Sequence, residues 1–94
     1  MVDSLISNEK RCVVCKTTEN LHRHHIYEGF ANRPKSEKFG CWCYLCARHH
    51  NMSNAGVHFN KQLEMYLKKK CQKAWEAKFG SREDFIKTFG RNYL

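Results

Sequence analysis

The stretch FGCWCYLCARHH, residues 39–50, decides the fold of this chain. Residues 39–45 are rich in aromatic side chains and alternate in character, which predicts a β-strand. Residues 46–51 then predict the start of a short helix that ends at Asn54-Ala55-Gly56. Cys46 would leave the strand and His49 would lie on the first helical turn, so two metal-binding side chain types meet at one strand-to-helix junction.

A second strand is predicted upstream, at residues 21–27 (LHRHHIY). Side chains alternate along a strand, so His22 and His24 would share one face and Arg23 and His25 the other. The intervening residues 28–38 contain Gly29 and the only proline, with several cations, and predict a basic loop. Two antiparallel strands followed by a short helix are therefore expected.

Two cysteines separated by two residues, Cys12 and Cys15, resemble a metal knuckle. A structural zinc ion needs four soft or borderline ligands, and the set that we favour is Cys12, Cys15, Cys46 and His49. Cys43 also forms a Cys-x-x-Cys with Cys46 and could replace His49, so this alternative stays open. We expect the remaining cysteines, Cys41 and Cys71, to be small buried hydrophobic residues.

The downstream half predicts two helices. Apolar residues recur every three or four positions from Asn60 to Phe79, and Gly80 would end that helix. The shorter helix would begin with Ser81 as N-cap and end at Gly90. Its inward side chains are expected to be Phe85, Ile86 and Phe89.

Composition and charge limit the class of protein. The chain has 94 residues and carries 17 Lys and Arg against 9 Asp and Glu, a formal charge of +8. That length suits one small domain, and the excess of positive charge favours a polyanionic partner, most often nucleic acid. The absence of a long apolar run or a leader predicts a cytoplasmic protein without a membrane partner.

We therefore expect residues 1–10 to form a flexible arm and residues 11–94 to form a single zinc-stabilised α+β domain. Its core would be residues 12–58, and residues 60–94 would supply one long and one short C-terminal helix.

Histidines exceed what one zinc site requires. If His49 is a zinc ligand, His22, His24, His25, His50 and His58 have no structural task. We expect His22 to be simply hydrogen-bonded or exposed. The other four indicate chemistry, because imidazoles brought together bind metal and abstract protons near neutral pH.

The order of these motifs resembles the HNH endonuclease family, whose active unit is the ββα-metal fold. The resemblance rests on the Cys-x-x-Cys, the His-His-Ile at residues 24–26 and Leu45-Cys46-x-x-His49-His50. The chain is most similar to short HNH-like proteins from phages and prophages of Gram-positive bacteria. That likeness extends over most of the chain, from Cys12 to the C-terminal residues 89–94.

The resemblance implies a role for each surplus histidine. His25 matches the general base that deprotonates the attacking water. His24 stands in the place of the first-strand metal ligand, and His50 matches the helix histidine that binds the catalytic ion. His58 is a plausible further ligand, and Asn54 is the alternative because it follows His50 by four residues on the same helical face.

One residue departs from the HNH pattern. The middle asparagine, which normally helps to hold the base imidazole, should fall near Cys41, and no asparagine is there. Either Asn32 or Asn60 would have to substitute for it through the fold.

The expected function is a metal-dependent DNA endonuclease with one catalytic divalent ion, either Mg²⁺, Mn²⁺, Ni²⁺ or Zn²⁺. Its substrate would be double-stranded DNA cut with little sequence specificity, and a homodimer or a phage or host protein partner is compatible with this function. The alternative is a non-catalytic zinc module that binds nucleic acid or a protein. The cations expected to contact phosphates are Arg23, Arg33, Lys35, Lys38 and Arg48.

Overall fold

Two antiparallel strands form the centre of the molecule. In this computed structural model, which describes residues 3–50, 56–57 and 60–94, β1 (Leu21–His25) pairs with β2 (Trp42–Cys46). Leu21 lies opposite Cys46 and His25 lies opposite Trp42. The predicted pairing is confirmed, although β2 begins and ends later in the chain than the sequence indicated.

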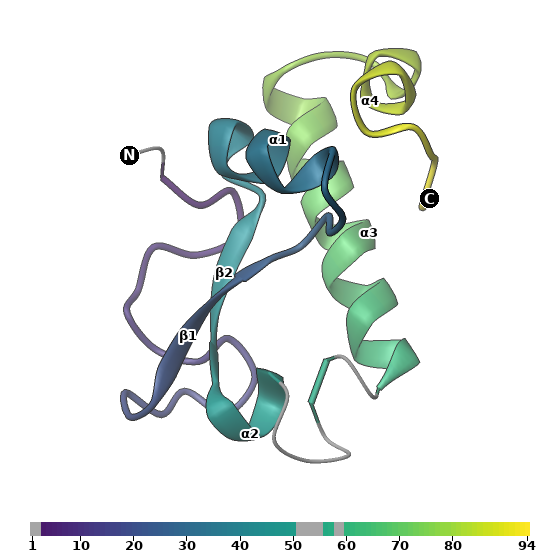
Figure 1. Ribbon diagram of the computed structural model, residues 1–94. Coiled ribbons are helices and arrows are strands. Elements are labelled where there is room, and N and C mark those ends of the chain that lie inside the picture. The colour runs from purple at the N-terminus through teal and green to yellow at the C-terminus, as the bar shows by residue number, and fades with distance from the viewer. Residues whose placement is uncertain (1–2, 51–55, 58–59) are drawn as a thin grey trace.

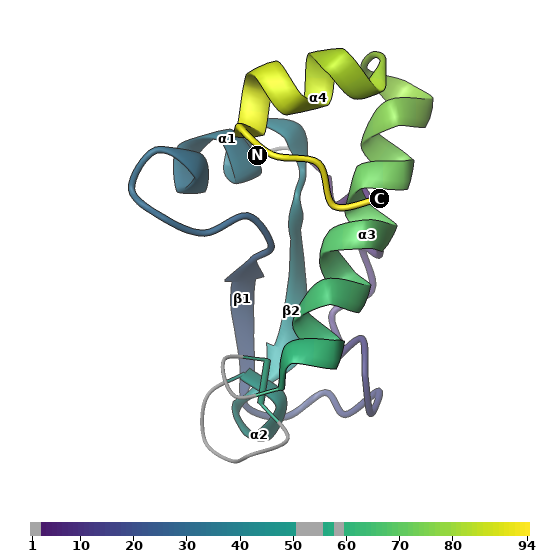
Figure 2. The same cartoon turned by 90° about the vertical axis from the view of Figure 1, so that its right-hand side faces the viewer.

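The described residues also form four helices, and their order confirms a small α+β fold. Figures 1 and 2 show a short helix, α2 (Ala47–His50), at one end of the strands. At the other end lie α1 (Asn32–Phe39) and α4 (Arg82–Phe89), and the long helix α3 (Lys61–Lys78) runs beside the sheet. No helix in this described part combines the length and apolar character needed to cross a membrane.

Helix α1 replaces most of the predicted basic loop at residues 28–38, so that prediction was wrong. Pro34 lies in the first turn of the helix, where a missing N–H is tolerated. Ser36 is buried, and its hydroxyl donates to the carbonyl of Tyr27 at 2.8 Å and accepts from the Tyr27 N–H at 3.2 Å. The helix is polar and has no hydrophobic periodicity that would predict it from the sequence. These tertiary contacts stabilise it.

Ser4 and Leu5 lie against β2 and the residue pair before it, although residues 1–10 were expected to form a flexible arm. The backbone N–H of Leu5 donates to the carbonyl of Gly40 at 2.8 Å, and the hydroxyl of the buried Ser4 donates to the carbonyl of Trp42 at 2.5 Å. Gly40 has φ +76°, and a Cβ there would come within 2.1 Å of the Asp3 carbonyl oxygen. Only glycine suits this position, because the backbone is left-handed and the N-terminal segment approaches so closely.

An aromatic cluster joins the C-terminal helices to the end of β1. The ring of Tyr27 packs against Phe85, Phe89 and Tyr93 at centroid distances of 5.2, 4.6 and 5.4 Å. Its hydroxyl donates to the carbonyl of Lys68 in α3 at 2.7 Å. Offset and edge-on aromatic contacts of this kind contribute beyond the area that they bury. Tyr27 therefore links the strand to both C-terminal helices.

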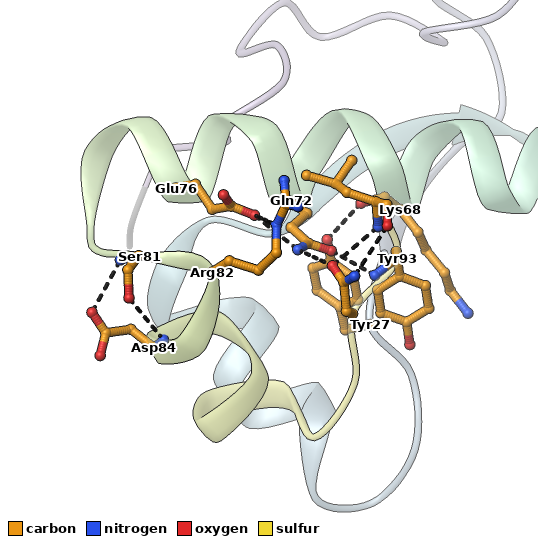
Figure 3. A network of polar contacts seen from close by, with 10 residues as sticks. Tyr27, Lys68, Gln72, Glu76, Ser81, Arg82, Asp84 and Tyr93 are labelled. Carbon is orange, nitrogen blue, oxygen red and sulfur yellow. Dashed lines mark hydrogen bonds and ion pairs between the residues drawn. The ribbon is translucent and has the colours of Figure 1, made fainter.

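A polar network closes the C-terminus onto α3 (Figure 3). The fully buried Gln72 donates to Asn92 Oδ1 and Glu76 Oε2, each at 2.8 Å, and accepts from the N–H of Tyr93 at 2.8 Å. A buried amide is costly unless it is paired, and here both of its polar atoms have partners. The tail after α4 is thereby held in one place.

The helix ends follow the sequence signals. Asn60 accepts from the N–H of Leu63 at 3.1 Å and caps α3. Ser81 and Asp84 form a reciprocal capping box at the start of α4, and Gly90 ends it with φ +87°. The predicted N-cap and stop are confirmed.

One predicted inward side chain is not in the core. Ile86 remains 38% exposed, whereas Phe85 is fully buried and Phe89 nearly so. Tyr66 and Phe79, on the predicted apolar face of α3, are also exposed. The surface of the sheet that can receive the helices is narrow, because the sheet has two strands in the described residues.

Substituting Phe85→Ala should lower the free energy of unfolding by about 3–5 kcal/mol, because it opens a cavity among aromatic rings. The matched control Ile86→Ala should change it by less than about 1 kcal/mol. Urea unfolding of the zinc-loaded proteins measures both values. Equal losses in the two variants would contradict the packing described here.

Candidate functional site: a metal centre and a histidine cavity

A tight turn presents the first two thiols of a candidate metal centre. The N–H of Lys16 donates to the carbonyl of Cys12 at 2.9 Å, and Lys16 itself has φ +66°. The N–H of Val13 donates to the carbonyl of Tyr44 at 3.0 Å, which fastens the turn to β2. Cys12 and Cys15 are thus held beside the end of that strand.

The second pair comes from the strand-to-helix junction. Cys46 is the last residue of β2, and His49 lies in α2. The N–H of Ala47 donates to the carbonyl of Asn20 at 2.9 Å, so the start of α2 is tied to the residue before β1. The predicted quartet of Cys12, Cys15, Cys46 and His49 comes together, with all ligand atoms within 4.8 Å of one another.

The spacing of these atoms fits a tetrahedral zinc ion. Zinc–ligand bonds of about 2.3 Å to sulfur and about 2.1 Å to nitrogen place two sulfurs about 3.8 Å apart, and a sulfur and a nitrogen about 3.6 Å apart. Cys15 Sγ lies 3.7 Å from Cys46 Sγ, and His49 Nδ1 lies 3.2 Å from Cys46 Sγ and 3.8 Å from Cys12 Sγ. The cluster could therefore hold a structural metal such as zinc.

The thiols differ in how readily they ionise. Burial raises the pKa of Cys12, but hydrogen bonds within the site, first from the backbone of Cys15 and then from that of Cys46, lower it to about 6. Burial raises the pKa of Cys46, and the neighbouring thiols add to this rise. Cys12 thus offers a thiolate near neutral pH, whereas Cys46 exchanges its proton for a cation when one binds.

Cys43, the alternative fourth ligand, does not belong to the cluster. Successive side chains of β2 point to opposite faces, so Cys43 lies on the face opposite Cys46. It is fully buried, and burial raises the pKa of its thiol to about 12. Cys41 and Cys71 are fully buried as well, which agrees with their expected role as small core residues.

We expect the purified protein to contain one zinc ion per chain. A strong chelator should remove the ion and lower the melting temperature, and the affinity for zinc should fall as the pH falls. Cys15→Ser should abolish stoichiometric zinc, because it removes one of the four ligands. Cys15 is exposed, so the substitution should not open a cavity in the core. Cys43→Ala is the matched control and should keep the metal. Zinc content is measured by atomic emission. Retention of zinc by Cys15→Ser together with its loss from Cys43→Ala would contradict the assignment.

A second group of histidines surrounds a cavity of about 310 Å³. Its lining residues are Arg23, His24, His25, Glu28, Arg33 and His50. His24 and His25 point to opposite faces of β1, yet both line this space. The rings of His24 and His50 lie 5.4 Å apart between centroids. Three of the four predicted catalytic histidines are therefore neighbours.

The remaining predicted ligand, His58, and its alternative, Asn54, fall outside the described residues. His22, which was expected to be simply hydrogen-bonded or exposed, is a further neighbour of His50. Its Nδ1 lies 2.9 Å from Nδ1 of His50. The alternation that puts His22 on the same strand face as His24 was the available signal, and the sequence could not show that α2 returns to that face.

Glu37 of α1 lies beside the predicted general base, a contact that the sequence did not indicate. Its Oε1 is 3.2 Å from Nε2 of His25, although that nitrogen is not aligned as a hydrogen-bond donor, and its Oε2 accepts from Arg23 at 2.7 Å. The two asparagines proposed as substitutes are employed elsewhere: Asn32 donates to the carbonyl of Phe89, and Asn60 caps α3. Glu37 thus lies beside the predicted base, where the sequence comparison with the HNH pattern predicted an asparagine.

The predicted phosphate contacts divide into two groups. Arg23 pairs with Glu37 and stacks over Trp42 at 3.9 Å, and Lys35 donates to the carbonyl of Thr88 at 2.7 Å, so both serve the fold. Arg33, Lys38 and Arg48 are exposed, and Arg33 also lines the cavity.

Comparison of the chain with models of known protein families, with curated proteins and with solved structures finds no match.

Proposed function

We propose that this protein is a metal-dependent DNA endonuclease of the HNH type, with the cavity beside β1 as its active site. The observation that carries the proposal is the convergence of His24, His25 and His50 on one cavity. A purely structural zinc module would need only the four ligands of the metal centre. The ββα-metal character of the core belongs to the same proposal.

His24 and His50 would hold the catalytic ion. His24 is buried and His50 lies close to it, so neutral imidazoles from two elements face one space, a donor set that suits Mn²⁺, Ni²⁺ or Zn²⁺ better than Mg²⁺. When bound, the ion would stabilise the negative charge that develops on the phosphate and on the leaving oxygen. His22 would orient His50 by accepting a hydrogen bond from its Nδ1–H, which leaves Nε2 of His50 for the ion.

His25 would act as the general base. With the Glu37 carboxylate beside Nε2, the tautomer that carries its proton on Nε2 is favoured and the lone pair stays on Nδ1. Nδ1 would take a proton from water, whose oxygen then bonds to phosphorus as the 3′ oxygen leaves. The contact to Glu37 is poorly aligned in the free protein, and such contacts commonly tighten when the substrate binds.

The positive charge of the chain supports DNA as the substrate. Arg33 extends from the cavity wall, and its guanidinium suits bidentate contact with a phosphate. A phage or prophage origin and a bacterial cytoplasmic location remain predictions from the resemblance.

Purified protein should nick supercoiled plasmid when Mn²⁺ or Ni²⁺ is added, and His25→Ala should slow nicking about 100-fold or more, because the base is lost. Added imidazole should restore part of the rate to His25→Ala. Gel electrophoresis of the plasmid measures both rates, with zinc content confirming the fold. If the wild type and the variant are equally inert while holding zinc, the non-catalytic binding module is the correct interpretation.

Glu37→Gln should lower the nicking rate at saturating DNA about 10- to 100-fold with little change in KM, because the base imidazole loses its orienting carboxylate. Its pH–rate profile should also differ from that of the wild type. The exposed Glu83→Gln is a control for the change in net charge and should leave rate and profile intact. An equal loss of nicking rate in both variants would show that the change in net charge, and not the place of Glu37 beside His25, lowers the rate.

A further inference from the structure

Phe30 is the most exposed large apolar side chain in the described part of the molecule. Its exposure is 101% of the reference value, and the next is Tyr66 at 58%. Burying a phenylalanine ring normally stabilises a fold. A ring with this exposure is available to bind something else.

The backbone holds Phe30 in a defined turn. Ile26 and Tyr27 are buried before it, and α1 begins two residues after it. Gly29 has φ +95°, and its carbonyl accepts from the N–H of Arg33 at 3.0 Å, which closes the turn around Phe30. Both sides of the loop are therefore anchored, and the backbone at Phe30 is held in one place.

A second hollow of about 450 Å³ lies at this turn, lined by Gly29, Phe30, Arg33 and Pro34. Arg33 also lines the histidine cavity, so the two spaces adjoin at its side chain. The hollow thus offers a flat aromatic face and a guanidinium next to the candidate catalytic residues.

That combination suits a nucleobase and its phosphate. A base stacks on an aromatic ring whatever its identity, and arginine binds the adjoining phosphate. The net charge of +8 favours the same polyanion. A protein partner is the weaker fit, because its binding surface would need a larger apolar patch than one ring and one proline.

We infer that Phe30 stacks on an unpaired base while Arg33 holds its phosphate, so that the preferred ligand is single-stranded, gapped or branched nucleic acid. In an intact duplex the faces of the bases are covered by their neighbours, so the ring has no face to stack on. The binding site stands on its own geometry, and only the statement that the unpaired base lies next to the cleaved bond rests on the proposed nuclease function. The inference differs from the sequence-based expectation of double-stranded DNA.

Binding of a labelled oligothymidine strand and of a duplex of equal length, measured by fluorescence anisotropy on zinc-loaded protein without added divalent ion, tests this site. Phe30→Ala should weaken binding of the single strand about tenfold and of the duplex less than about twofold. Phe30→Trp should retain binding, because the indole also stacks. Tyr66→Ala, which removes an exposed aromatic ring from α3, is the matched control and should bind as the wild type does.

Salt dependence separates the two contacts. Arg33→Gln should make the slope of log affinity against log salt less steep by about 0.7, and Phe30→Ala should leave the slope unchanged. Unchanged affinity in Phe30→Ala, equal losses on single strand and duplex, an equal loss in Tyr66→Ala, or no binding by the wild type would each overturn the site. Because cleavage is not required, single-strand binding that depends on Phe30, with no metal-dependent cleavage of either the single strand or the plasmid, would leave the site standing and refute the nuclease.

Discussion

The metal centre is the constraint on which the rest of the candidate site depends. Its ligands join a turn near the N-terminus to the end of β2 and to α2, and α2 is a single short turn that could not hold its position alone. His49 and His50 are consecutive in this helix. A metal bound by His49 therefore also fixes His50 against the histidines of β1, so a structural ion would position the candidate catalytic one.

The opposite end of the molecule is held by a different means. Rings of α4 and of the C-terminal tail pack on Tyr27, and Phe39 of α1 and Trp75 of α3 extend this cluster. The buried amide of Gln72 secures the C-terminal tail. Burial supplies the stabilisation there, while ligand bonds would supply it around α2. The histidine cavity lies at the open edge of β1 between these two anchors, which suits a site that must stay accessible and keep its shape.

Helix α1 connects the two anchors to the candidate chemistry. Ser36 hydrogen-bonds the backbone of Tyr27, Glu37 faces His25, and Arg33 stands between the two hollows. One short polar helix thus contacts the core through Ser36, the His25 imidazole through Glu37 and both hollows through Arg33. A loop in the same place would leave the His25 imidazole without a fixed neighbour.

The metal quartet was predictable because its ligands are chemically distinctive and arrive in close pairs, so that local spacing alone brings each pair together. The N-cap and stop of α4 and the burial of Phe85 followed for the same reason, since capping and period are local properties. The pairing of His22 with His50, by contrast, joins residues 28 positions apart through the return of α2.

The sequence by itself thus determined three candidate metal ligands, a choice of His49 or Cys43 for the fourth, the small α+β class and the histidines available for chemistry. Only the tertiary structure decided that His49 and not Cys43 joins the cluster. It brings His49 of α2 to the three thiols, whereas Cys43 lies on the face of β2 opposite Cys46. It also decided that residues 32–39 are helical and that Glu37 meets His25. These features arise from contacts between distant segments, and no local pattern of hydrophobicity or spacing encodes them.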